Sequence, residues 1–273
     1  MEKKEWQGAG GETWAREWRR TDRSFAAVTE KLLRATRNFS FDTVLDVGCG
    51  AGELSLAVAR GRPNCRVLGV DVSPALIEAA QVRGPSHRNL SFELGDAGEW
   101  SPPAGFLPQL LISRHGVMFF EDPPAAFSNL ARIAADYAHI LFSCFRSREE
   151  NPFYAEIARL LPEPPSPPPP ASPGPFAFAD KQRIREILTA GGWCDIVIES
   201  FDFAMITGTG DDAIEDTVDY FSCIGPAAAI AREMDEGTRC EFFDKIRNMA
   251  RNYLSNGIVA LPAAGWIVAA RKK

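Results

Sequence analysis

The sequence predicts an α/β protein built on a doubly wound, mostly parallel seven-stranded sheet, with an N-terminal helix and a helical lid insertion. Val/Ile/Leu-rich runs separated by helical segments carry this prediction, because strands buried on both faces of a parallel sheet are apolar without alternation. The runs start far enough apart for a crossover helix between each pair, and such crossovers are right-handed. The expected parallel strands are residues 43–47, 66–70, 90–94, 109–113 and 138–143.

Two later apolar runs complete the expected sheet. Residues 194–204 and 265–270 follow the parallel set and are separated by a helical stretch at 211–254. Late strands on either side of a helical insertion predict a sheet whose final edge mixes strand directions.

Capping residues mark where several helices begin. Ser73 and Asp122 each precede a proline, which is favoured at the first helical position, and Asp180 begins a further helix. Apolar residues at helical spacing predict one amphipathic helix over 12–37. Nine prolines within 162–175 predict an extended surface loop.

These patterns divide the chain into three expected parts. They are an N-terminal helical segment at 1–40, a ligand-binding core at 41–205 and 255–273, and a helical lid insertion at 206–254. Ligands bind outside the carboxyl ends of the strands in sheets of this type. We therefore expect the N-terminal helix and the insertion to close over that crevice.

Composition and charge narrow the classes of partner. Lys and Arg number 30 against 36 Asp and Glu, and a formal charge of −6 argues against a nucleic-acid partner held by phosphate contacts. Six cysteines without a C-x-x-C pair and three scattered histidines predict neither a metal site nor a disulfide framework. The longest apolar run, 257–270, is too short for a membrane span, and no apolar leader is visible. We expect a cytoplasmic protein without a membrane partner.

A glycine-rich sequence follows the first expected strand. Residues 44–52 read VLDVGCGAG and contain Gly48, Gly50 and Gly52. Glycines let the chain turn sharply and bring backbone N–H groups against a ligand at the start of the next helix. Cys49 is a small residue that fits such a loop. The place of the motif between a strand and a helix, more than its glycine spacing, makes it a candidate binding loop.

Acidic residues follow the next two expected strands. Asp71 ends the second strand, where a carboxylate can accept hydrogen bonds from both hydroxyls of a ribose. Gly95, Asp96 and Ala97 follow the third strand, and Asp96 there can accept a hydrogen bond from an adenine amino group. The alternative for either aspartate is a structural role as a helix N-cap or turn former.

Taken in order, these motifs resemble those of the class I S-adenosylmethionine-dependent methyltransferases, in particular the UbiE-like small-molecule group. VLDVGCGAG resembles their first motif, GVDVS their ribose-binding motif, GDA their adenine-binding motif, and ISRHGVMFFEDP the segment after their fourth strand. The resemblance is close over 41–145 and implies a Rossmann-like fold with S-adenosyl-L-methionine as the cofactor.

The resemblance also implies roles for single residues. The glycines and Cys49 would line the methionine and ribose part of the cofactor, and Asp46 would hold the glycine loop or, through water, the cofactor amino group. The remaining implied contacts are Asp71 to ribose, Val72 packed on adenine, Gly95, Asp96 and Ala97 at the adenine edge, and Ser113 and Arg114 at the methionine end. Many members of the family have an aromatic residue where this chain has His115.

The expected activity is methyl transfer to oxygen or carbon of a small, partly apolar metabolite. A non-catalytic S-adenosylmethionine-binding regulatory protein is one alternative. An NAD-dependent oxidoreductase is another, but its G-x-G-x-x-G fingerprint requires glycine where this chain has Glu53. The sequence leaves open whether the protein forms a homodimer.

His115 is the candidate catalytic residue. It follows the fourth expected strand at the crevice and, with an ordinary pKa near 6.5, would serve as general base for a hydroxyl acceptor. The alternative is that the His115 ring only packs against the cofactor pocket.

Overall fold

The structure is a computed structural model that describes residues 3–163, 169 and 172–273. The sequence predicts an extended loop over the proline-rich segment at 162–175, of which residues 164–168, 170 and 171 lie outside the described residues.

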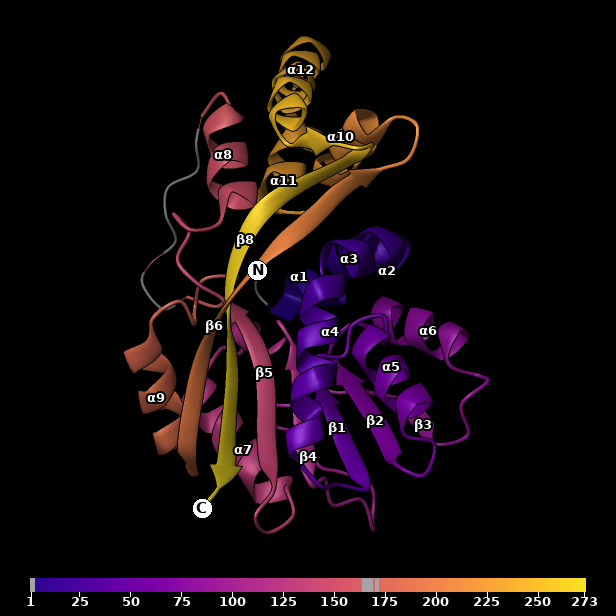
Figure 1. Cartoon of the computed structure of the whole chain (residues 1–273), viewed down its shortest axis with the longest axis vertical. Helices are drawn as coiled ribbons and strands as arrows, with labels where there is room; N and C mark the ends of the chain where they lie inside the picture. Colours follow the sequence, from indigo (N-terminus) through magenta and orange to yellow (C-terminus); the bar gives the residue numbers. More distant parts are fainter. Residues whose placement is uncertain (1–2, 164–168, 170–171) are drawn as a thin grey trace.

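The described residues form one mixed sheet flanked by helices (Figure 1). Its strand order is β3-β2-β1-β4-β5-β8-β6, and the short β7 pairs with β8. The pairs β1–β2, β1–β4, β2–β3 and β4–β5 are parallel, and β8 runs antiparallel to β5 and to β6. The predicted doubly wound, mostly parallel fold is confirmed. The strands are β1 (Thr43–Val47), β2 (Arg66–Asp71), β3 (Leu90–Leu94), β4 (Leu110–Arg114), β5 (His139–Phe145), β6 (Trp193–Thr209), β7 (Leu254–Ser255) and β8 (Ile258–Lys272).

The last two long strands extend well beyond the predicted ranges 194–204 and 265–270. Pro262 interrupts the apolar pattern in the sequence, yet it pairs with Ala204 inside the ladder, and neighbouring side chains such as Leu261 and Ala263 are buried. The extra length carries both strands past the carboxyl ends of the parallel strands (Figure 1). This antiparallel arm holds the helical insertion above the strand ends.

Helices cover both faces of the sheet, and several begin where the sequence predicts. Ser73 Oγ accepts a hydrogen bond from Leu76 N, and Asp122 Oδ1 and Asp180 Oδ1 cap their helices in the same way. The helices around the sheet are α5 (Glu53–Gly61), α6 (Pro74–Arg83), α7 (Pro123–Ile133), α8 (Pro152–Leu160) and α9 (Lys181–Ala190), with a 3-10 turn at Val117–Phe119.

The N-terminal segment differs from the single helix predicted over 12–37. It consists of α1 (Lys3–Gln7), α2 (Ala9–Arg16), α3 (Trp18–Ser24) and α4 (Ala26–Ala35), followed by a 3-10 turn at Thr36–Asn38. The helix breaks at Glu17 and at Phe25, whose ψ angles are 17° and 15°. Phe25 is buried with its ring 5.2 Å from that of His115. Tertiary contacts of this kind override the continuous helical pattern.

The insertion between β6 and β8 is helical, as predicted for 211–254, but it is divided into three helices. They are α10 (Ala213–Cys223), α11 (Pro226–Glu233) and α12 (Glu236–Asn252). Gly225, with φ of 94°, separates the first two, and Asp235 caps the third. The division of the chain into segment, core and lid remains a prediction.

Gly52 provides a test of how tightly the glycine loop is packed. Its φ is 86°, and a Cβ atom there would lie 2.8 Å from Cζ of Phe92. We expect Gly52→Ala to lower the free energy of unfolding by about 1–3 kcal/mol, because it adds left-handed backbone strain to a clash. Urea denaturation measures this change.

Gly61→Ala is the matched control, because Gly61 ends α5 and has open space around its Cβ position. This variant should be as stable as the wild type or more so. Equal stability of Gly52→Ala and the wild type would contradict the packing described here.

Candidate functional site

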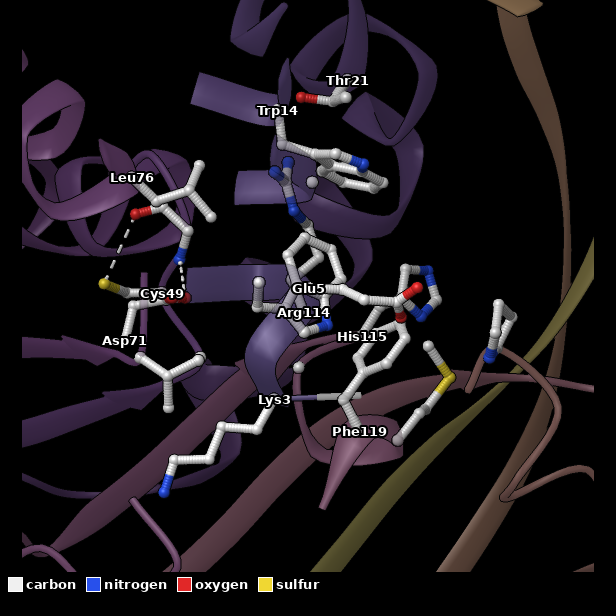
Figure 2. Close-up of a pocket in the computed structure, with 18 of the residues that line it drawn as sticks. Lys3, Glu5, Trp14, Thr21, Cys49, Asp71, Leu76, Arg114, His115 and Phe119 are labelled. Atoms are coloured by element: carbon white, nitrogen blue, oxygen red, sulfur yellow. Dashed lines mark hydrogen bonds between the residues drawn. The ribbon is translucent and has the colours of Figure 1, made fainter. Parts of the chain in front are cut away.

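A cavity of about 770 Å³ lies at the carboxyl ends of the parallel strands. Figure 2 shows side chains from the N-terminal helices, such as Lys3 and Trp14, gathered with Asp71, Arg114 and His115 from the strand ends. Residues of α10 and α11 also line the cavity. Segments far apart in the sequence therefore meet at one site.

Asp71 joins the glycine loop to the second strand. Its Oδ2 accepts a hydrogen bond from Gly50 N at 2.9 Å, and its Oδ1 accepts one from Ser73 N at 2.9 Å. Burial raises the pKa of this carboxyl, while the backbone donors act in the opposite direction. Gly50 has φ of 55°, and no atom lies within 4 Å of its Cβ position. The loop therefore presents bare backbone beside a buried carboxylate, which suits a polar ligand.

Most of the predicted site residues meet at this cavity. Those lining it are Gly48, Cys49, Gly50, Asp71, Val72, Gly95, Asp96, Ala97, Arg114 and His115.

Three predicted site residues, Asp46, Gly52 and Ser113, do not line the cavity. Asp46 is 1% exposed and accepts a hydrogen bond from Ser55 Oγ at 2.6 Å, and burial raises its pKa to about 6. Ser113 Oγ donates to the carbonyl of Val47 at 2.7 Å. The Asp46 and Ser113 side chains are therefore held by buried contacts within the core.

Lys3 is a cavity residue that the sequence analysis missed. Its Nζ lies 2.6 Å from Oδ2 of Asp96, while Oδ1 of Asp96 accepts a hydrogen bond from Gly98 N at 2.9 Å. Helix α1 thus reaches the end of β3. Lys3 and Asp96 are 93 residues apart, and no sequence pattern links them, so this contact could not be predicted.

Asp22, on α3, is the second residue that was missed. Its Oδ1 lies 2.9 Å from Arg114 Nη2, and its Oδ2 lies 2.8 Å from Arg83 Nη2. Arg83 also pairs with Glu53 at 2.7 Å. In the sequence Asp22 is one acidic residue within a basic amphipathic stretch, which is typical of a solvated helix face.

His115 is buried and structurally constrained. It has φ of 64° and is 8% exposed, and its ring stacks on Phe145 with centroids 4.3 Å apart. Ser143 Oγ accepts a hydrogen bond from His115 N and lies 3.3 Å from Nδ1. Nε2 is buried and has no hydrogen-bond partner among the described residues.

The expected ordinary pKa of His115 is therefore wrong. Burial, and secondly the positive charge of Arg114, lower the pKa of His115 to about 3, although a contact with the Ser143 backbone acts in the opposite direction. The ring is neutral at physiological pH and is a much weaker base than free imidazole.

The part of the cavity beyond His115 is mainly apolar. It is walled by side chains from β5, α8, β6 and the insertion, namely Phe145, Phe153, Tyr154, Ile157, Met205, Phe221 and Ile224. Such a surface suits a partly apolar ligand. Within the part of the chain that the structure describes, no group of three or more His, Cys, Asp or Glu could hold a metal ion.

Residues 44–137 match the family model of the methyltransferase domain. The solved structure of geranyl diphosphate C-methyltransferase from Streptomyces coelicolor, in complex with Mg²⁺, geranyl diphosphate and S-adenosyl-L-homocysteine, aligns with a TM-score of 0.51. That alignment covers 91% of this chain and 79% of the other, at 16% identity. The chain has the class I methyltransferase fold.

Two curated relatives match part of this chain in sequence. Trans-aconitate 2-methyltransferase of Methylobacterium radiotolerans is 41% identical over 78 residues, which are 29% of this chain and 28% of that protein. Malonyl-(acyl-carrier protein) O-methyltransferase 1 of Ilyobacter polytropus is 27% identical over 120 residues, 44% of each protein. The chain thus spans less than half the length of these curated relatives. No helix among the described residues is long and apolar enough to cross a membrane.

The buried His115 predicts a pH dependence of stability. The pKa of this histidine falls from 6.5 in the unfolded chain to about 3 in the fold. Below pH 6.5 the unfolded chain therefore binds a proton that the folded chain does not bind, and the free energy of unfolding falls as the pH falls. Between pH 7.5 and 5 we expect the wild type to lose about 2 kcal/mol more unfolding free energy than His115→Asn. Asparagine tolerates the left-handed backbone at this position.

Urea denaturation of both proteins across this pH range measures the difference. The two curves should run parallel above pH 7.5 and separate below pH 6.5. Parallel curves down to pH 5 would contradict a neutral, buried His115.

Proposed function

We propose that this protein transfers a methyl group from S-adenosylmethionine to oxygen or carbon of a small, partly apolar metabolite. The observation that carries the proposal is the convergence of Asp71, Asp96 and the bare backbone of the glycine loop on one cavity. The match of residues 44–137 to the methyltransferase domain supports it. We keep the UbiE-like small-molecule group as the proposed subgroup and the cytoplasm as the proposed location.

The residues at the strand ends fit the nucleoside part of this cofactor. Asp71 lies at the cavity with an acceptor lone pair left on each oxygen after its two backbone bonds, so it can accept from ribose hydroxyls. Val72 and Ala97 offer apolar surface for the adenine ring, and Asp96 can accept from its amino group. S-adenosylmethionine supplies, when bound, a methyl group on a positively charged sulfur.

The apolar end of the cavity fits the acceptor. Methyl transfer from a sulfonium is an in-line displacement, so alignment and exclusion of water can supply much of the rate enhancement. The walls formed by α8 and by α10 and α11 of the 206–254 lid would hold the acceptor, and the proposed role of the lid is to exclude water. His115, being neutral, would contact the acceptor or cofactor as a hydrogen-bonding and packing group.

Titration calorimetry with the full chain tests the cofactor assignment. We expect S-adenosylhomocysteine to bind and NAD not to bind. Asp71→Asn should weaken S-adenosylhomocysteine binding by about ten- to a hundredfold, because hydrogen bonds to a charged group contribute about 1.5–3 kcal/mol.

Asp180→Asn is the matched control, because it makes the same change at the N-cap of α9, where asparagine also caps well. It should leave the affinity unchanged. Tighter binding of NAD than of S-adenosylhomocysteine, or an unchanged affinity in folded Asp71→Asn, would contradict the proposal.

A further inference from the structure

We propose that Asp22 and Arg114 together recognise the zwitterionic amino-acid end of the cofactor, Asp22 accepting from the α-ammonium group and Arg114 donating to the α-carboxylate. This inference rests on the proposed function. It assigns to the N-terminal segment a binding residue, Asp22, that lies outside the methyltransferase-domain match at 44–137.

The order of the strands places this pair at the correct end of the site. Along the edge in the order β3, β2, β1, β4, the groups at the strand ends are Asp96, Asp71, the glycine loop and Arg114. Neighbouring strands lie about 4.8 Å apart, so three steps span about 14 Å. With adenine at Asp96 and ribose at Asp71, the amino-acid end of an extended ligand reaches the end of β4.

Arg114 and Asp22 both line the cavity and retain hydrogen-bonding capacity. Figure 2 shows Arg114 extending from the strand end toward the helices that carry Trp14 and Thr21. Its guanidinium has five N–H donors, of which one bonds Asp22 and one bonds Thr29 Oγ1 at 2.9 Å. Each oxygen of Asp22 accepts one bond from an arginine and keeps a further lone pair.

The charge balance of the cluster favours a zwitterion over a singly charged ligand. Among the groups joined by ion pairs, the two carboxylates of Asp22 and Glu53 face the two guanidinium groups of Arg83 and Arg114. The side chains of Asp22 and Arg114 are only 13% and 15% exposed, where an unmatched charge is poorly solvated. A ligand that brings one ammonium and one carboxylate leaves the balance unchanged.

The same contacts could serve only to clamp the N-terminal helices onto the core, and a pair of ligands separates the two roles. S-adenosylhomocysteine has the amino-acid end, whereas 5′-methylthioadenosine has the same nucleoside and thioether sulfur but lacks it. Titration calorimetry on the full chain should show Asp22→Asn weakening S-adenosylhomocysteine by about ten- to a hundredfold, with 5′-methylthioadenosine changed by less than about threefold. If Asp22 only holds the N-terminal helices on the core, Asp22→Asn should weaken the binding of both ligands equally.

Glu17→Gln is the control variant, because Glu17 pairs with Arg20 in the same N-terminal segment but does not line the cavity. It should leave both affinities unchanged. A second experiment compares two ligands on the wild-type protein. S-adenosylhomocysteine acetylated on its α-amino group should bind at least about tenfold more weakly than the parent compound.

Equal losses for both ligands in Asp22→Asn, or undiminished binding of the acetylated ligand, would overturn the inference while leaving the proposed function intact. If the wild type binds neither S-adenosylhomocysteine nor 5′-methylthioadenosine, the proposed function fails and the inference fails with it.

Discussion

The two backbone hydrogen bonds that Asp71 accepts are the interaction on which the site depends. One carboxylate oxygen holds Gly50 in the loop after β1, and the other holds Ser73 at the start of α6. The loop passes through positive φ at Gly48 and Gly50 as it brings the Gly50 N–H to that carboxylate, a conformation that glycine adopts without strain. A buried carboxylate without such donors would be strongly destabilising, so loop and aspartate stabilise one another.

The N-terminal segment completes the cavity through charged contacts rather than through a continuous helix. Lys3 reaches Asp96 at the end of β3, and Asp22 reaches Arg83 and Arg114. Partly buried ion pairs contribute little net stability once desolvation is counted, so these contacts mainly fix position. They bring charged groups to a cavity whose far end is lined by apolar side chains, so the cavity has a polar end and an apolar end.

Much of the fold, and part of the site, could be predicted from the sequence because the signals are local. The parallel strands and the glycine loop follow from runs and spacings within about 30 residues of one another. The features that the sequence did not predict depend on contacts between distant residues. They are the helix breaks at Glu17 and Phe25, the full length of β6 and β8, and the low pKa of the buried His115. The place of Asp22 and Lys3 at the cavity could not be predicted, because their partners are distant in the sequence and come together only in the folded chain.

Hydrogen–deuterium exchange with and without S-adenosylhomocysteine tests most directly the claim that strand ends and N-terminal helices form one cofactor site. The account predicts slower exchange in residues 44–52, 71–76 and 95–98 and, in the same experiment, in α3 (Trp18–Ser24). Slowed exchange in the strand-end segments alone would remove the N-terminal helices from the site. Unchanged exchange in all four segments at saturating ligand would contradict the claim as a whole.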